Sequence, residues 1–328
     1  MQRFADAFAP RPWVYWADML AAAAVGWGAL YVAVGAERFS PLNLAATLIA
    51  ICGMLRATLF IHELAHLKPG SLPGFHGVWS ALVGVPMLVP SIMYMGSHMD
   101  HHRPSGFGTL GDPEYAPIAR WSRLRIVLFV VTVAFVPCLL VLRWGVLGPL
   151  SWAFPRLRKL VVERLSTLVI NDTYVRPMPT GKRAERWLRE EQAAAGFVWC
   201  VAISVALGWL PLAAVIQWLL VGAGLLVVNQ VRTLAAHGYQ NEGEPVDREA
   251  QLLDSINLTG WPLLTSLIAP VGLRYHALHH LLPSLPYHSL GKVHRALVAE
   301  LPPDAPYRRT ECASVLQPVQ KLWNEAPV

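Results

Sequence analysis

The sequence predicts an all-α integral membrane protein built as a bundle of about four to six transmembrane or re-entrant helices. Of its 328 residues, 54% are hydrophobic and only 15% are charged, with a mean hydropathy of +0.40. Soluble proteins carry about 25% charged residues. Long apolar runs recur along the chain, and nine of the twelve histidines gather at the polar ends of these runs. The histidine groups predict a metal site at one membrane face.

The apolar runs give the expected helices in order. The four strongly apolar runs cover residues 19–36, 42–61, 124–147 and 196–231. A weaker run covers residues 78–95. A helix crosses a bilayer with about 20 apolar residues, so the first two runs predict a hairpin of spans. The last strong run is too long for one span. A break at residues 208–211 favours two short helices, and a single long kinked helix is the alternative.

The polar parts of the chain fit loops and tails of a membrane protein. The net charge is +6, and Lys and Arg gather at residues 156–164 and 182–189. Such basic connections are typical of cytoplasmic loops that touch anionic lipid, and they do not indicate nucleic-acid binding. Amphipathic stretches between residues 151 and 192 predict helices that lie on the membrane surface. Residues 1–328 are expected to form one domain, in which 295–328 is a soluble C-terminal tail.

Two further features exclude other classes. The four cysteines are scattered without a CxxC pair, so neither a thiolate metal site nor a disulfide framework is indicated. The first apolar stretch is longer than the about 7–15 residues of a signal peptide, so a retained helix is expected there.

The histidine groups carry the functional signal. Two triplets have the spacing i, i+3, i+4, one pair has the spacing i, i+4, and one histidine stands alone. On a helix these spacings place the side chains on one face. In chain order the candidate ligands are His62 and His66; His98, His101 and His102; His237; and His276, His279 and His280. Neutral imidazole suits iron, copper, nickel and zinc. Nine ligands exceed the four to six that one ion takes, so two metal ions are expected.

Each group taken alone has an ordinary interpretation. A helical histidine pair is often a surface pair, and a lone His237 is often a hydrogen-bonded core residue. The three remaining histidines are expected outside the site. His288 and His294 fall in a polar segment and predict surface positions or contacts with ligand residues, and His76 lies between glycines in an expected loop.

The histidine groups resemble the conserved sequence motifs, called histidine boxes, of the membrane fatty acid desaturase and hydroxylase family. The third box supports this resemblance, because residues 276–287 read HALHHLLPSLPY, with an apolar pair and prolines after the histidines. The similarity runs from about residue 42 to 294. It implies that the nine histidines bind two non-haem irons, that O2 is a co-substrate, and that a lipid acyl chain lies in a tunnel past the metals. It also implies a separate electron donor of ferredoxin, rubredoxin or cytochrome type.

The expected reaction is O2-dependent desaturation of a lipid acyl chain. Hydroxylation, carotenoid ketolation and terminal-alkene formation use the same ligand set and stay open, because substrate placement decides among them. The expected location is a bacterial inner membrane, with the active site facing the cytoplasm. A metal-binding scaffold without enzyme activity is the non-enzymatic alternative.

Two positions depart from the family pattern. Some members place an asparagine four residues before the isolated histidine, where this chain has Thr233; Asn229 and Asn257 are weak substitutes. Glu63 turns the first box into HExxH, which is also the motif of zinc proteases. An intramembrane protease is therefore a second alternative, but it leaves both HxxHH boxes unexplained.

Carboxylates are expected to hold the ligand imidazoles, because neutral rings do not offset the metal charge. The candidates for this outer layer are Glu63, Asp100, Asp112 and Asp254, together with Asn257. For two of them a purely structural role is equally consistent: Asp112 would begin a turn, and Asp254 would cap a helix.

Topology follows from the short metal–nitrogen bonds, about 2.0–2.2 Å, which force all ligands to one face. Residues 78–95 must then be re-entrant rather than spanning, and Pro86 and Pro90 fit a broken helix there. Whether residues 124–147 cross the membrane an odd number of times stays open at this level.

Overall fold

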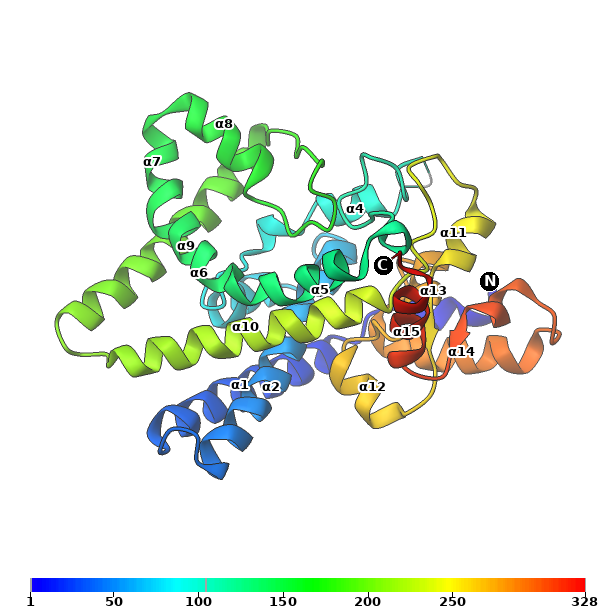
Figure 1. Ribbon diagram of the computed structural model, residues 1–328, viewed down its shortest axis with the longest axis horizontal. Coiled ribbons are helices and arrows are strands. Elements are labelled where there is room, and N and C mark those ends of the chain that lie inside the picture. Colours follow the sequence, from blue (N-terminus) through cyan, green and yellow to red (C-terminus); the bar gives the residue numbers. More distant parts are fainter. Residues whose placement is uncertain (1, 104, 328) are drawn as a thin grey trace.

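A computed structural model describes residues 2–103 and 105–327, and its regular structure is almost entirely helical (Figure 1). The α-helices are α1 (Pro12–Gly35), α2 (Pro41–His66), α3 (Phe75–Trp79), α4 (Ser97–His101), α5 (Arg123–Val131), α6 (Val136–Leu142), α7 (Gly148–Ala153), α8 (Pro155–Arg164), α9 (Gly181–Ala206), α10 (Leu212–Leu234), α11 (Arg248–Asp254), α12 (Pro262–Ile268), α13 (His276–Leu281), α14 (Tyr287–Glu300) and α15 (Leu316–Glu325). The fold class predicted from the sequence is confirmed.

Short irregular helices and one small sheet complete the fold. The 3₁₀-helices are η1 (Gln2–Phe8), η3 (Ser91–Met93), η4 (Ile118–Arg120), η5 (Thr132–Phe135) and η7 (Pro306–Thr310), and the π-helices are η2 (Ser80–Gly84) and η6 (Arg143–Leu147). Strands β1 (Asn257–Leu258) and β2 (Glu311–Cys312) pair in parallel.

The first two spans form the predicted hairpin. Proline in the first turn starts both helices, and the Ser40 hydroxyl caps α2 by accepting from the Asn43 amide. The helices cross at two glycines, since a Cβ added to Gly53 would lie 2.8 Å from the Gly26 nitrogen. Small residues let helix backbones approach closely in a membrane. The hairpin returns α2 to the face at which α1 begins.

The segment from residue 75 to 97 is re-entrant, as its prolines and the metal geometry predict. It descends through α3 and the π-helix η2, turns at Pro86 and rises through η3. The imidazole Nε2 of His76 lies 2.9 Å from Ser91 Oγ, so the chain returns beside its own point of entry. Indole nitrogens of Trp144 and Trp218 donate to the carbonyls of Leu88 and Pro86, and these bonds satisfy part of the exposed backbone.

The third apolar region resolves the question of parity. Its helices α5, η5, α6, η6 and α7 run on from one another over residues 123–153, but the path bends at the π-helix η6. Figure 1 shows α5 and α6 beside α10, and α7 and α8 turning away toward the top of the view. The chain that follows returns to the starting face, because the Ile170 amide donates to the Pro113 carbonyl and Asn171 Nδ2 to the Asp112 carbonyl. The number of crossings between residues 121 and 171 is therefore even.

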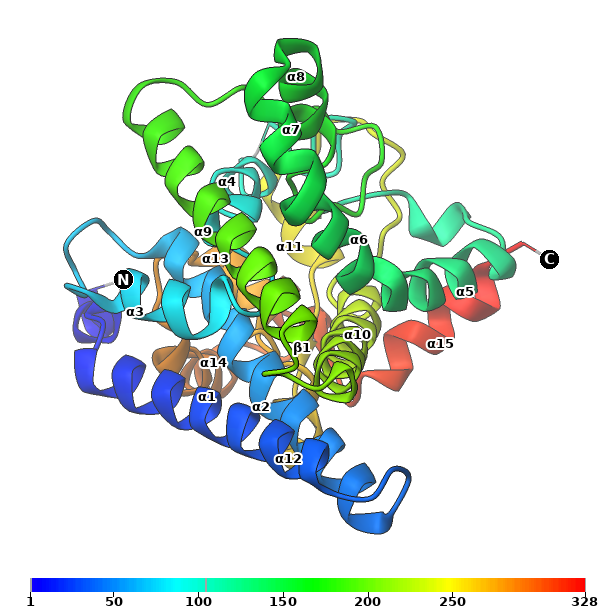
Figure 2. The same ribbon diagram turned by 90° about the vertical axis from the view of Figure 1, so that its left-hand side faces the viewer.

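The last apolar region is a hairpin of two helices, as the break at residues 208–211 predicts. Helix α9 ends at Ala206 and α10 begins at Leu212, with Gly208 in the left-handed conformation between them at φ 75°. Helix α9 begins earlier than expected, at Gly181, so the basic stretch 182–189 is its first part. Figure 2 shows the pair α1 and α2 at the bottom of the view and the pair α9 and α10 above it.

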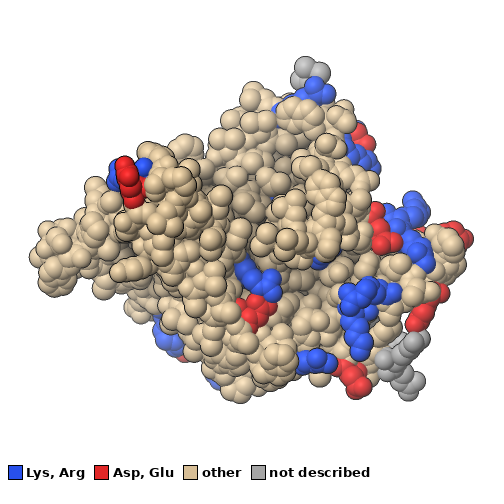
Figure 3. Space-filling model, turned by 90° about the horizontal axis from the view of Figure 1, so that it is seen from below, with Lys and Arg blue, Asp and Glu red and all other residues tan. Residues whose placement is uncertain are grey.

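The surface fits a membrane environment. Four helical stretches are long and apolar enough to cross a membrane, covering Phe4–Gly35, Pro41–His66, Arg123–Ala153 and Leu212–Leu234. Large apolar side chains such as Leu48, Phe135 and Leu220 are exposed on them. Most of the surface seen in Figure 3 lacks charged side chains, and those present gather mainly toward the right-hand end of the view. The expected C-terminal tail packs against the rest of the protein through α15, where Leu322 is buried.

Candidate metal centre

The four histidine groups meet at one end of the helix bundle. His62 and His66 lie in the last turns of α2, and the first triplet, at residues 98–102, lies on the short helix α4 and the residue that follows it. His237 follows the end of α10, and the second triplet, at residues 276–280, lies on α13. Segments up to about 200 residues apart in sequence thus converge, as the one-face argument predicts.

The nine histidines divide into two clusters whose ligand atoms lie within 4.8 Å of one another. The five-histidine cluster consists of His62, His66, His98, His102 and His279. The four-histidine cluster consists of His101, His237, His276 and His280. Each triplet contributes to both clusters, so α4 and α13 bridge them.

The nitrogen atoms inside the clusters are arranged for metal rather than for hydrogen bonding. His98 Nε2 lies 2.8 Å from His66 Nε2 and 3.0 Å from His102 Nε2, which itself lies 3.0 Å from His279 Nε2. One ring proton cannot satisfy so many converging nitrogens. Both ring nitrogens of His62 are buried without a hydrogen-bond partner among the described residues. A cation placed among these lone pairs would satisfy them, so the residues fit a metal in each cluster.

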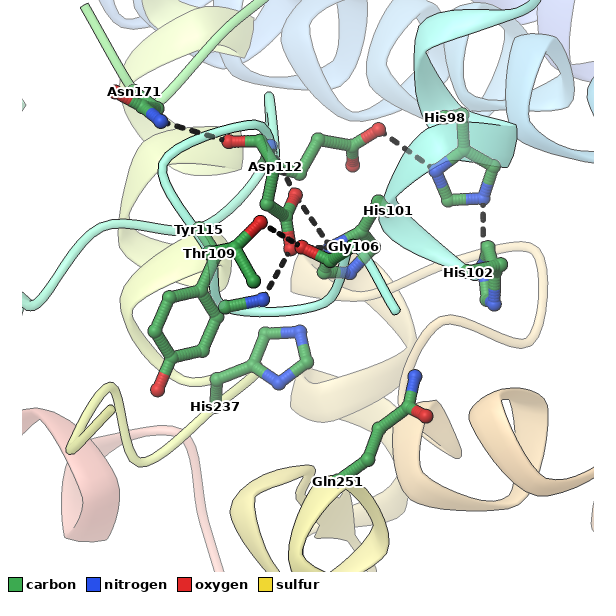
Figure 4. A network of polar contacts seen from close by, with 12 residues as sticks. His98, His101, His102, Gly106, Thr109, Asp112, Tyr115, Asn171, His237 and Gln251 are labelled. Atoms are coloured by element: carbon green, nitrogen blue, oxygen red, sulfur yellow. Dashed lines mark hydrogen bonds and ion pairs between the residues drawn. The ribbon is translucent and has the colours of Figure 1, made fainter. Parts of the chain in front are cut away.

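Carboxylates hold the other side of three rings. The Asp112 oxygens lie 2.9 and 3.0 Å from His101 Nδ1, Glu114 Oε1 lies 2.7 Å from His98 Nδ1, and Asp254 Oδ2 lies 3.3 Å from His237 Nδ1. Figure 4 shows the loop that carries Asp112 folded over His101. Asp112 and Glu114 accept a hydrogen bond from Nδ1–H and leave Nε2 as the lone pair that faces the cluster. Asp254 lies beside His237 Nδ1, but among the described residues its Oδ2 has no hydrogen-bond partner.

Burial tunes these groups. It lowers the pKa of His98 well below its usual value, with His102 adding to the effect, so the ring stays in the neutral form that binds metal. Burial also opposes the charged form of His101, but Asp112 outweighs it and raises the pKa of that ring. Burial raises the pKa of Glu114 to about 7. Positive charge in the clusters is what would keep this carboxylate ionised.

The outer-layer candidates from the sequence fare differently. Asp112 and Asp254 contact ligand histidines, and Asp112 also begins the expected turn by accepting from the Glu114 amide. Asp100 instead contacts Tyr174 and Arg103. Asn257 acts on the backbone, where its Oδ1 accepts from the Leu278 amide and so fixes α13.

Glu63 has its own arrangement. Its Oε2 accepts from the Tyr15 hydroxyl at 2.5 Å and from the Tyr287 amide at 3.2 Å, while Oε1 lies 3.7 Å from His62 Nδ1. The carboxylate therefore ties α2 to α1 and to the start of α14. Both histidines of the HExxH motif lie in the five-histidine cluster, which a single catalytic zinc with three protein ligands does not explain.

Sequence reasoning missed two partners of the clusters. Glu114 lies two residues after Asp112, and its position in the turn was the only available signal. Gln251 Nε2 lies 3.1 Å from His280 Nδ1, and nothing in the sequence of α11 marks it. Thr233, at the family's asparagine position, is buried and accepts from Arg232 Nη2 at 3.1 Å.

The three remaining histidines correct the sequence expectations in part. His76 lies in helix α3 rather than in a loop and contacts Ser91 and Arg186. His294 is buried and not at the surface, and its Nδ1 lies 2.8 Å from the Tyr307 hydroxyl. The segment around His294 is polar in sequence, so the sequence does not indicate that its side chain lies on the buried face of α14. His288 is half-buried and accepts from the Arg11 amide.

A cavity of about 470 Å³ opens beside both clusters. Its inner wall includes His62 of one cluster and His101, His237 and His276 of the other. Away from the histidines the walls are leucines and valines from α2, α6, α10 and the segment after α8. Cavities of this size and apolar character hold small molecules or lipid chains.

The comparisons with known proteins agree with this site. The family model for fatty acid desaturases matches residues 39–311, which include all nine histidines. This chain belongs to the fatty acid desaturase family. It is 40% identical over 318 residues to a protein named ceramide hydroxylase from Caulobacter vibrioides (strain NA1000 / CB15N), and the match covers 97% of this chain and 90% of the relative. No solved structure matches the chain.

Membership in the family makes the chain an oxidoreductase of lipid metabolism. The expectation of desaturation as the main reaction is weakened, because the named relative is a hydroxylase.

Proposed function

We propose that this chain is a diiron lipid hydroxylase that uses O2 to add a hydroxyl group to a ceramide-type lipid. The observation that carries the proposal is 40% identity to a ceramide hydroxylase over nearly the whole length of this chain, a match that spans the region of all nine cluster histidines. The apolar cavity that reaches both clusters supports a substrate with a long hydrocarbon chain.

The proposed reaction balances with a reductant. One oxygen atom of O2 enters a C–H bond to give an alcohol, the other leaves as water, and two electrons and two protons are consumed. The chain has no cysteine or haem motif for electron transfer, so a separate ferredoxin, rubredoxin or cytochrome would supply the electrons. When bound, the irons supply the oxygen activation that side chains lack.

The protein's own residues prepare the site. Asp112 and Glu114 accept hydrogen bonds from the Nδ1–H groups of His101 and His98 and so orient their Nε2 atoms, and Asp254 lies beside His237 Nδ1. The leucines and valines of the cavity exclude water and align the hydrocarbon chain beside the clusters. The position of the reacting carbon relative to the clusters decides between hydroxylation and removal of a second hydrogen.

We further propose that the site faces the cytoplasm of a bacterial inner membrane. An even number of crossings between residues 121 and 171 supports a position of the basic stretch 182–189 on the side of the histidines, and the stretch 156–164 is joined to the same region by Arg164, which donates to the Thr173 carbonyl. Cytoplasmic loops carry an excess of Lys and Arg.

The test is purification of the full chain in lipid nanodiscs with metal analysis and turnover. About two irons per chain are expected. With a ferredoxin, its reductase, NADPH and a saturated ceramide, mass spectrometry should show lipid that has gained one oxygen. Lipid that has lost two hydrogens would restore desaturation as the main reaction, and one zinc without iron would favour the protease alternative.

A further inference from the structure

A single arginine stands out on the cavity wall near the clusters. Arg232 lies on the last turn of α10, five residues before His237. Helix α10 ends at Leu234, and both Arg232 and His237 line the same cavity, together with His276. A group bound by Arg232 in this cavity would therefore sit near the cluster histidines.

The protein leaves much of this guanidinium free. Its Nε donates to Asn229 Oδ1 at 3.0 Å, and its Nη2 donates to Thr233 Oγ1 at 3.1 Å. Both partners are neutral, and among the described residues neither bond reaches a carboxylate. A guanidinium has five N–H donors, so three remain for another acceptor. A charged group on an apolar cavity wall is costly unless it finds such a partner.

A second arginine on the same wall shows the contrast. Arg143 lines the apolar part of the cavity and is buried, but its bonds go to protein. Its Nε donates to the Leu165 carbonyl at 2.9 Å, and its Nη2 lies 2.7 Å from both Ser166 Oγ and Glu191 Oε1. The charge of Arg143 is thus paired with the Glu191 carboxylate, although its Nη1 is buried without a hydrogen-bond partner among the described residues, whereas Arg232 bonds only to neutral oxygens.

The local charge favours a neutral acceptor over an anion. Glu114 is the acidic residue in the described cavity lining, and it offsets the charge of Arg232 at longer range. The neighbours Asn229, Thr233 and Tyr239 add hydroxyl and amide groups to this part of the wall. An amide carbonyl or a hydroxyl at the polar end of a lipid chain matches this set.

Resting on the proposed function, we propose that Arg232 binds the amide oxygen of the ceramide and thereby sets where the hydroxyl group is added. The amide lies at Arg232, and the hydrocarbon chain extends along α10 past Leu226 and Leu225 into the apolar part of the cavity. The carbons next to the amide then lie beside the clusters. Hydroxylation falls within the first few carbons of the polar end, not in the middle of the chain.

The test compares wild type, Arg232→Met, Arg232→Lys and the control Arg248→Met, an exposed arginine on α11 near the same end. Each full-length protein is placed in nanodiscs with saturated ceramide. Turnover and tandem mass spectrometry give the KM and the position of the new hydroxyl. Binding of ceramide without O2 gives the affinity without chemistry, and metal analysis reports the irons.

In wild type the hydroxyl should lie within a few carbons of the amide. Arg232→Met should keep its irons, bind ceramide about 10–100-fold more weakly and spread the hydroxyl over several positions, since a hydrogen bond to a charged group is worth about 1.5–3 kcal/mol. Arg232→Lys should fall between the two, and Arg248→Met should behave as wild type.

Three results would overturn the inference while leaving the proposed function intact. They are a mid-chain hydroxyl in wild type, unchanged affinity and position in Arg232→Met, or loss of iron in that variant. Tighter, Arg232-dependent binding of a free fatty acid would also overturn the choice of a neutral acceptor. If wild type adds no oxygen to any lipid, the proposed function itself fails.

Discussion

Ring orientation is the common theme among the cluster histidines. His98, His101 and His237 present Nδ1 to a carboxylate of the surrounding loops, whereas the Nδ1 of His280 faces the amide nitrogen of Gln251, which is a donor. The Nε2 atoms of His98, His237 and His280 lie within about 3 Å of another cluster nitrogen. A proton fixed on Nδ1 decides the tautomer and leaves Nε2 as the metal ligand. The outer carboxylates thus determine the ligand atom.

Glu114 provides a test of this role. Glu114→Gln removes the charge that holds His98 and should lower iron affinity or activity about 10–100-fold. Asp100→Asn is the matched control, because Asp100 contacts Tyr174 and Arg103 and should keep both properties. Iron content and turnover of the two variants are measured side by side. Equal effects of both changes would show that a general loss of acidic charge is responsible.

His237 tests the two-cluster arrangement. His237→Ala removes one of four nitrogens from its cluster and should lower the iron content from two toward one and abolish turnover. The half-buried His288 is the better control than the buried His294, and His288→Ala should keep two irons. Full iron and normal activity in His237→Ala would mean that the site has eight histidine ligands.

The residue scale also shows what sequence alone can give. The nine histidines could be predicted because spacings of three and four residues are visible along the chain, and the short bonds of a metal force them together. Their partners could not. Glu114 reaches His98 across 16 residues of loop, and Gln251 reaches His280 from another helix, so the contacts depend on how those loops fold. His294 was misplaced because a polar neighbourhood does not reveal which helix face is buried.

At the scale of elements, backbone contacts set the positions of α1 and α2. Gly53 lies against Gly26, and a Cβ at Gly53 would lie 2.8 Å from a backbone nitrogen that cannot move without separating the helices. Gly53→Ala should therefore destabilise the protein by about 1–3 kcal/mol. Gly28→Ala is the control, since an exposed Cβ there meets nothing within 4 Å. Thermal unfolding in detergent compares the two, and an equal melting temperature would mean that the glycine contact is not needed.

Sequence reasoning predicted these elements well where the hydrophobic length decided them. Both hairpins and the broken helix at residues 75–97 follow from apolar length, proline and glycine. The bend at η6 did not, because residues 124–147 read as one straight span. At this bend Arg143 bonds to Leu165 and Glu191 far along the chain, so contacts distant in sequence help to hold it.

On the scale of the whole molecule, the bend at η6 determines on which side of the membrane the basic loop after residue 153 lies. If residues 123–153 made one crossing, the basic loop after them would lie opposite the histidines. The structure instead returns that loop to Asp112 and Pro113. The prediction that residues 1–328 form a single domain stays a prediction, although the core residues of α1, α2, α10 and α14 pack into one cluster.

Cysteine labelling in intact cells tests this topology. In a background without the four native cysteines, Arg156→Cys and Arg248→Cys should be protected from a membrane-impermeant thiol reagent added outside and should react after the cells are opened. Trp209→Cys is the matched control, because Trp209 is 76% exposed at the tip of the α9–α10 hairpin and should react from outside. The expected pattern follows from the even number of crossings before residue 171 together with the preference of basic loops for the cytoplasm. Labelling of Arg156→Cys from outside, with Arg248→Cys still protected, would mean that residues 123–153 cross the membrane once and that the bend at η6 is not present there.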